Sequence, residues 1–344
     1  MTKVIKIDPI NPEAESIALA AEVIKNGGLV ALPTETVYGL GADATDADAA
    51  MKIYAAKGRP SDNPLIIHIA SPEDAERYAF TCELYYRLAK AFMPGPLTVI
   101  MPKKDIIPSS VTGGLDSVAV RCPSHNIARE LIAAAGVAIA APSANLSGSP
   151  SPTSAAHVIS DLDGRVDMII DGGDAEIGLE STIVKIDGDS LTLLRPGGIT
   201  YDALLCVCDK VSIAPAVTDK LAENERPLSP GMKYRHYAPS APLVLLDGEY
   251  EKVLSFMSEA QRSENCAIIC FDEDADVLSK DNIIAIGKKD DQATQASRLF
   301  SALRDADKLT VDIIYAHLPA KDGIGLALYN RMIRAAAHTI KKID

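Results

Sequence analysis

The chain has 344 residues, of which 47% are apolar and 24% charged, a balance typical of a soluble protein long enough for two domains. Its net charge of −13 disfavours a protein whose main role is to coat nucleic acid. No apolar run reaches the roughly 20 residues of a membrane helix, and the N-terminus lacks the pattern of a signal peptide. We therefore expect a cytoplasmic location and no membrane partner.

Short β-rich runs alternate with helical stretches over the first two-thirds of the chain. This alternation predicts an α/β fold with a large mixed, twisted sheet and flanking helices. The expected strands are 4–7, 29–32, 65–69, 97–101, 118–121, 138–141, 168–171, 182–186 and 191–194.

Two helices of this region have clear signals. Asn11 and Pro12 suit the start of the first helix, as a cap and a first-turn proline, and Gly27 with Gly28 suits its end. Its apolar stripe consists of Ile17, Ala20, Ala21 and Ile24. The second helix is expected at about 126–135.

From residue 242 the pattern becomes regular, which predicts a smaller doubly wound (Rossmann-like) α/β domain. This part has neither a G-x-G-x-x-G run after its first strand nor a Walker loop, so we assign it no cofactor. The expected strands are 243–246, 267–270, 283–286 and 313–316, and the expected helices are 250–262, 294–304 and 326–340.

These patterns divide the chain into an N-terminal domain at 1–210, a linker at 211–240 and a C-terminal domain at 241–344. Within the linker, the run from 229 to 239 contains Lys233, Tyr234 and Arg235 and no acid. A solvated tether is one interpretation. We favour a lid that closes over a ligand site and excludes water from it.

Polar and glycine-rich turns follow several of the expected strands, where open α/β sheets bind ligands. The run P-T-E-T-V-Y-G-L-G at 33–41 offers hydroxyl groups and accessible backbone N–H groups, although an ordinary tight loop would also explain it. Lys57 and Arg59, followed by Asn63, could clamp a triphosphate or could form a solvated charge pair at a helix end.

Two charged or titratable side chains lie in apolar strands. His68 interrupts an apolar run, and Arg121 ends another. A histidine in a strand is often structural, and an arginine at a strand end either binds a carboxylate or forms an ion pair. Further along, Ser143, Asn145 and the run E-S-T at 180–182 supply small polar groups suited to phosphate or ribose.

Taken together, five motifs resemble the YrdC-type threonylcarbamoyl-AMP synthases, over roughly residues 10–200 and in that family's order. They are P-T-E-T-V-Y-G-L at 33–40, K-x-R-P at 57–60, P-G-P-L-T at 94–98, S-x-N at 143–145 and E-S-T at 180–182. The linker and the additional α/β domain resemble the long two-domain branch.

The resemblance implies a nucleotidyltransferase that makes L-threonylcarbamoyl-AMP and pyrophosphate from L-threonine, bicarbonate or CO2, and ATP. A downstream tRNA threonylcarbamoyl transferase complex would then modify an adenosine next to the anticodon. The resemblance implies Mg2+ with ATP, which we expect ATP and water to hold, because the sequence shows no carboxylate cage. We therefore expect no protein metal site.

The same resemblance implies roles for individual residues. Lys57 and Arg59 would be catalytic and would hold the phosphates. The other residues implied at ATP are Asn63, Ser117, Ser143, Asn145, Arg195 and Tyr234. The residues implied at threonine are Thr34, His68, Ser181 and Arg121, the last on the carboxylate.

Two other functions are compatible with parts of this pattern. One is a double-stranded RNA or tRNA-binding module without catalysis, but residues 1–210 carry a net charge of −10, so any tRNA contact is expected to be weak. The other is a carbamoyltransferase of the hydrogenase-maturation type, whose acylphosphatase and C-x-x-C zinc modules this sequence lacks.

Overall fold

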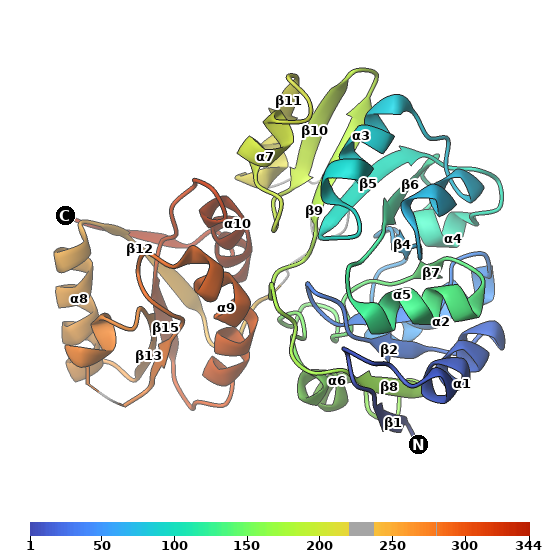
Figure 1. The fold of residues 1–344 in the computed structure, drawn as a ribbon. Coiled ribbons are helices and arrows are strands. Elements are labelled where there is room, and N and C mark those ends of the chain that lie inside the picture. The colour runs from blue at the N-terminus through green and yellow to red at the C-terminus, as the bar shows by residue number, and fades with distance from the viewer. Residues whose placement is uncertain (220–236, 280) are drawn as a thin grey trace. The chain divides into compact units, whose positions relative to one another are not determined.

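The computed structural model describes residues 1–219, 237–279 and 281–344. These residues form two compact α/β units, one made of 1–147 and 151–219 and the other of 148–150 and 237–344 (Figure 1). The predicted fold class is confirmed for both units. Over these residues, none of the helices combines the length and hydropathy that crossing a bilayer requires.

The N-terminal unit is built on an 11-stranded mixed sheet. In spatial order, its strands are β1 (Lys3–Lys6), β8 (Met168–Asp171), β2 (Val30–Leu32), β3 (Gly39–Asp43), β7 (Ile139–Ala140), β4 (Ile66–His68), β6 (Ser117–Arg121), β5 (Leu97–Pro102), β9 (Thr182–Asp187), β10 (Ser190–Arg195) and β11 (Val211–Ile213). All nine predicted strands are present, with ends shifted by at most one or two residues. β3 and β11 were not predicted.

β3 begins within the glycine-rich run at 33–41, which the sequence suggested was a loop, and extends two residues beyond it. Glycine has low strand propensity, so the pattern gave no strand signal. A Cβ atom added to Gly41 would lie 2.7 Å from Ile139 Cγ2 and 2.9 Å from Leu32 Cδ2. The absence of a side chain at Gly41 therefore lets neighbouring residues pack over the strand, which is a tertiary requirement.

Helices cover the sheet of this unit (Figure 1). They are α1 (Ala14–Lys25), α2 (Ala47–Lys57), α3 (Glu83–Phe92), α4 (Ser109–Thr112), α5 (Asn126–Ala135), α6 (Ala155–Leu162) and α7 (Tyr201–Leu205). The predicted helix at 126–135 is confirmed as α5, and the predicted apolar stripe of α1 is buried against α5 in one core cluster. The predicted cap at Asn11 is wrong, because α1 begins after Glu13 and has no side-chain cap.

The C-terminal unit has a five-stranded sheet in which all paired strands are parallel. In spatial order, its strands are β14 (Ile283–Ala285), β13 (Cys266–Cys270), β15 (Ile313–His317), β12 (Leu243–Gly248) and β16 (Ile340–Ile343). Helix α8 (Tyr250–Ser263) packs on one face, and α9 (Gln292–Ala306) and α10 (Gly325–Ala335) lie on the other (Figure 1). The predicted doubly wound domain is therefore confirmed.

The predicted last helix, 326–340, is wrong at its C-terminal end. α10 stops at Ala335, and the chain turns through left-handed conformations at Ala337 (φ 49°) and His338 (φ 64°) before it enters β16. The sequence contains no glycine or proline here that would predict this turn. The pairing of β16 with β12 compensates for the unfavourable backbone conformation, and such pairing is not visible in local sequence.

Candidate functional site

The sequence suggested that the predicted site residues share one carboxyl edge of the sheet. In the structure they do not. β4 and β6 are parallel, so His68 and Arg121 end these strands at the same edge. β7 is antiparallel to β4, so Ser143, which follows β7, lies at the opposite edge. The expectation was wrong because the sheet is mixed, and antiparallel neighbours have their carboxyl ends at opposite edges. The candidate residues therefore form two groups.

The first group joins the K-x-R and S-x-N motifs. Lys57 is the last residue of α2, and Gly58 turns the chain in the left-handed conformation (φ 62°) directly after it. Lys57 is 2% exposed, and its ammonium group donates hydrogen bonds to the backbone carbonyls of Ser143 and Asn145. Two motifs that lie 86 residues apart in the sequence thus meet at one ammonium group.

Short hydrogen bonds make the loop after β7 rigid. The Ser143 hydroxyl donates to Asn145 Oδ1 at 2.5 Å, and Asn145 Nδ2 donates to the carbonyl of Leu146 at 2.8 Å. The Ser147 N–H in turn donates to the Lys57 carbonyl at 2.9 Å. The positions of these polar groups are therefore set before any ligand arrives.

Arg59 faces the loop that leads into β4. Its Nη2 donates to the carbonyls of Asn63 and Pro64 at 3.3 and 3.1 Å. The Asn63 side chain is buried, and its Oδ1 accepts no hydrogen bond within the described residues. Ser117 is the first residue of β6, so it lies at the opposite end of this strand from Arg121, at the same edge of the sheet as Ser143.

The second group is centred on a buried ion pair that we call the Arg121 cluster, formed by Glu35, His68, Thr98, Arg121 and Ser181. Arg121 Nη2 lies 2.8 Å from Glu35 Oε1, and the two side chains are only 5% and 6% exposed. The strand register puts His68 on one side of Arg121 and Thr98 on the other. Apart from this ion pair, neither Glu35 oxygen accepts a hydrogen bond within the described residues, and Arg121 Nε and Nη2 donate none.

Burial and charge keep the nearby histidines neutral. Burial, with the positive charge of Arg121 as a smaller cause, lowers the pKa of His68 from 6.5 to about 3. Burial also lowers the pKa of His125, although the Glu35 carboxylate opposes this shift. Both Nδ1 atoms are buried and have no hydrogen-bond partner among the described residues. The cluster therefore contains one cation, one anion and neutral polar groups.

Ser181 and Arg195 adjoin this cluster. The hydroxyl groups of Ser181 and Thr98 lie 2.7 Å apart. Arg195 donates from Nε to the Ser181 carbonyl at 3.0 Å and from Nη2 to its hydroxyl at 3.2 Å. Arg195, for which the resemblance implies a contact with the nucleotide, thus binds Ser181, whose hydroxyl adjoins Thr98 in the Arg121 cluster.

Thr34 holds the loop that carries Glu35. Its hydroxyl donates to the Val37 carbonyl at 2.6 Å and lies 2.8 Å from the Thr36 hydroxyl. The Ile177 N–H binds the Glu35 carbonyl at 2.8 Å from outside the loop. These contacts direct the Glu35 side chain into the unit, towards Arg121.

Sequence reasoning assigned no role to Glu35 or Thr98, although both lie in the quoted motifs. The sequence signal for Glu35 was an acidic residue between two threonines, and it did not indicate that the carboxylate pairs with Arg121. Tyr234 and the rest of the expected lid up to residue 236 lie outside the described residues. In the part of the chain that the structure describes, no group of three or more His, Cys, Asp or Glu side chains could hold a metal ion.

Comparison with known families matches almost the whole sequence. Residues 22–197 match the Sua5/YciO/YrdC family, described as "Telomere recombination", and residues 199–337 match "Threonylcarbamoyl-AMP synthase, C-terminal domain". The chain is 45% identical to a threonylcarbamoyl-AMP synthase of Bacillus subtilis, with 96% of this chain and 95% of that protein covered. It is also 45% identical to one of Pyrococcus abyssi, with 96% and 97% covered.

Solved structures agree with this result. The structure of P. abyssi Sua5 complexed with L-threonine superposes with a TM-score of 0.93 at 43% identity and covers 100% of both chains. Escherichia coli YciO resembles the chain with a TM-score of 0.53 at 26% identity, covering 57% of this chain and 96% of YciO. The likeness to YciO is thus confined to part of the chain, whereas the likeness to Sua5 extends over both units.

Proposed function

Since the chain belongs to the two-domain, Sua5-type family of threonylcarbamoyl-AMP synthases, enzymes that make L-threonylcarbamoyl-AMP, we propose that its N-terminal unit forms this product from L-threonine, bicarbonate or CO2, and ATP. Pyrophosphate is the second product. The buried Arg121–Glu35 pair is the observation that carries the proposal, because it offers both charges that a zwitterionic amino acid requires. The related P. abyssi enzyme was crystallised with L-threonine.

Arg121 binds the threonine carboxylate in this proposal. A guanidinium has five N–H donors in a planar fork that matches the two oxygens of a carboxylate. Apart from the ion pair of Nη2 with Glu35, Arg121 Nε and Nη2 make no hydrogen bond among the described residues, so the guanidinium retains N–H donors for the substrate. Because the low pKa of His68 keeps its imidazole neutral, Arg121 supplies the positive charge of the cluster for the carboxylate.

Glu35 receives the threonine ammonium group. Its two oxygens accept no hydrogen bond from the described residues, and an ammonium supplies three donors. The amine must lose a proton before its lone pair can attack the carbon of CO2, and the Glu35 carboxylate takes that proton as a general base. A nitrogen–carbon bond forms while one carbon–oxygen π bond of CO2 opens and leaves its electron pair on oxygen. The nitrogen then releases its second proton to solvent, which gives the carbamate anion.

Hydroxyl and imidazole groups recognise the threonine side chain. Ser181 and Thr34 are expected at the hydroxyl of the substrate, with the Thr98–Ser181 hydrogen bond fixing the orientation of the serine. His68 Nδ1, which is buried and has no hydrogen-bond partner in the described part of the chain, provides a further neutral polar contact. A polar site of this kind rejects analogues that leave its buried groups unpaired.

ATP binds on the Lys57 side of the sheet. Lys57 and Arg59 hold the phosphates, and Asn63, Ser117, Ser143 and Asn145 contact the nucleotide. The carbonyls that hold the Lys57 ammonium orient it, although the phosphates must take over part of this coordination. Arg195 donates to the Ser181 carbonyl, and this contact supports a role for its guanidinium where the carbamate meets the α-phosphate.

Mg2+, held by the triphosphate and water, supplies further charge neutralisation when it is bound with ATP. The neighbours of Lys57 and Arg59 in the structure are carbonyl, hydroxyl and amide groups, which fits an ion whose anionic ligands are the phosphates.

The second step is a displacement at phosphorus. A carbamate oxygen attacks the α-phosphate, an oxygen–phosphorus bond forms, and pyrophosphate leaves with the electron pair of the broken bond. Such a step depends on the position of the reactants and on neutralisation of charge, and it requires no protein nucleophile. The product passes to a tRNA threonylcarbamoyl transferase complex, in keeping with a cytoplasmic location.

The test is the release of pyrophosphate from ATP by the full-length chain. We expect release only when L-threonine and bicarbonate are both present. Release that does not depend on threonine would contradict the proposal. Stoichiometric binding of double-stranded RNA without pyrophosphate release would favour the non-catalytic RNA-binding module instead.

A further inference from the structure

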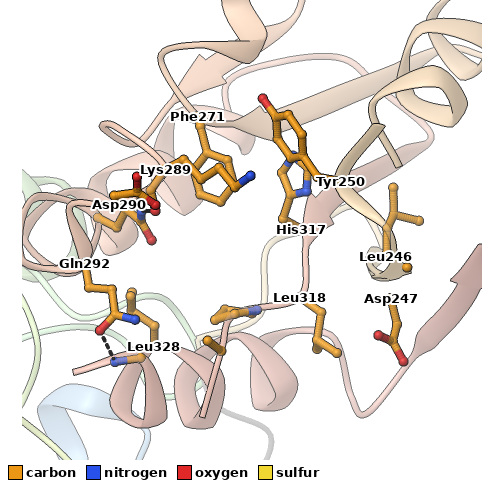
Figure 2. A pocket seen from close by; sticks show the side chains of 15 residues that line it. Leu246, Asp247, Tyr250, Phe271, Lys289, Asp290, Gln292, His317, Leu318 and Leu328 are labelled. Atoms are coloured by element: carbon orange, nitrogen blue, oxygen red, sulfur yellow. Dashed lines mark hydrogen bonds between the residues drawn. The ribbon is translucent and has the colours of Figure 1, made fainter. Parts of the chain in front are cut away.

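The C-terminal unit contains a cavity of about 410 Å³ at the carboxyl ends of β12, β13 and β15 (Figure 2). β12 and β15 are adjacent and parallel, and the helices that follow them, α8 and α10, lie on opposite faces of the sheet. Such a switch point is where open α/β sheets bind ligands. The volume lies within the range of small-molecule sites. The proposed chemistry of the N-terminal unit does not use this cavity.

Three aromatic rings form one wall of the cavity. The Phe271 and His317 rings are stacked with their centroids 4.6 Å apart, and the Tyr250 ring lies 5.7 Å from His317 in a nearly parallel orientation. The buried Asp274 carboxylate holds them in place. It accepts hydrogen bonds from the Tyr250 hydroxyl at 2.5 Å, from His317 Nε2 at 2.8 Å and from the Phe271 N–H at 2.9 Å. The wall is therefore rigid.

An ammonium group of the protein already lies on this wall. Lys289 Nζ is 3.7 Å from the centroid of the Tyr250 ring. The electron-rich face of a tyrosine attracts an ammonium, most strongly where water is partly excluded. The contact with Lys289 thus indicates that the aromatic wall accepts an ammonium group.

The charges around the cavity favour a cation. Figure 2 shows Asp247 and Asp290 on opposite sides of the cavity, with the aromatic wall between them. Lys289 is the one lysine or arginine among the lining residues, so a phosphate-bearing ligand would meet more negative than positive charge. Leu246, Leu318 and Leu328 provide apolar surface between the charged groups.

We propose that this cavity binds an aliphatic diamine or polyamine. One ammonium group pairs with Asp247 and another with Asp290, the methylene chain lies against the leucines, and the aromatic wall stabilises the positive charge. Alkyl ammonium groups stay protonated at neutral pH, as the ordinary lysine pKa of about 10.4 indicates. The ligand displaces the Lys289 ammonium from the Tyr250 ring.

Isothermal titration calorimetry of the full-length chain with spermidine and with putrescine tests this proposal. Asp247→Asn and Asp290→Asn should each weaken spermidine binding about threefold, since each removes one solvent-accessible ion pair. Butylamine, with a single ammonium, should bind more weakly than putrescine. Lys289→Met should tighten binding, because it removes the resident competitor.

A control variant distinguishes binding in the cavity from nonspecific attraction of a cation to an acidic protein. Glu259→Gln removes an equal charge from the exposed face of α8, outside the cavity, and should leave spermidine binding unchanged. Threonine-dependent pyrophosphate release by each variant reports that it is folded. Equal weakening by Glu259→Gln and Asp247→Asn, no heat of binding with spermidine at millimolar concentration, or binding of adenosine in place of the amines would overturn the proposal.

Discussion

Replacement of Glu35 by glutamine is the sharpest test of the Arg121 cluster. The substitution keeps the shape of the side chain and removes its charge, so Arg121 is left buried without its counter-ion. Both side chains are about 95% buried, at 5% and 6% exposure, and their charged atoms lie 2.8 Å apart. Removal of one partner from such a pair costs about 3–5 kcal/mol of unfolding free energy. Urea unfolding should show this loss as a lower midpoint with an unchanged slope.

The same variant should bind threonine poorly. A hydrogen bond to a charged group contributes about 1.5–3 kcal/mol, which corresponds to a rise in KM for threonine of about 10- to 150-fold. Because Glu35 is also proposed to accept the amine proton, kcat should fall as well. Pyrophosphate release measured over a range of threonine concentrations separates the two effects, and KM for ATP should stay near that of the wild type.

A double variant separates stability from function. Glu35→Leu together with Arg121→Leu removes both charges and should recover most of the lost stability, since apolar residues often replace buried ion pairs without cost. It should not recover activity. An unchanged KM for threonine in a folded Glu35→Gln variant would refute the role of Glu35 at the amine, and a stability loss below about 1 kcal/mol would refute the argument from burial.

Three further predictions concern other parts of the chain. Lys57→Ala should lower turnover more than tenfold and leave the protein folded, because it removes a charge-assisted contact worth about 1.5–3 kcal/mol; near-normal pyrophosphate release would exclude Lys57 from the phosphate site. The pKa of His68 is about 3 in the folded state, below the ordinary histidine value of 6.5. As pH falls from 6.5 towards 3, the unfolded chain therefore binds a proton at this residue before the folded chain does. The wild type should therefore lose about 2 kcal/mol of stability between pH 7 and pH 5 from this residue, and His68→Gln should flatten that part of the urea-derived profile. If 229–240 forms a lid, ATP and threonine together should slow proteolysis within it, and equal cleavage rates with and without ligands would identify a tether.

Much of the fold could be predicted from sequence because its signals are local. Alternating apolar runs located nine strands of the first sheet and four of the second, and the stripe on α1 identified the face that is buried. The predictions failed where distant contacts override local preference. β3 contains Gly39 and Gly41 and exists because of its neighbours, and α10 ends at Ala335 without a stop signal because β16 has to reach β12.

For the candidate site, the K-x-R, S-x-N and E-S-T motifs could be recognised from the sequence as candidate segments, since each is a short contiguous string of polar or charged residues. How these segments are grouped depends on the tertiary structure. The direction of β7 separates Ser143 from Arg121, and the Thr34 loop brings Glu35 within 2.8 Å of Arg121 across 86 residues of chain. Strand direction and ion pairing are long-range properties, because they depend on which segments become neighbours when the core is buried, and no local pattern encodes that choice.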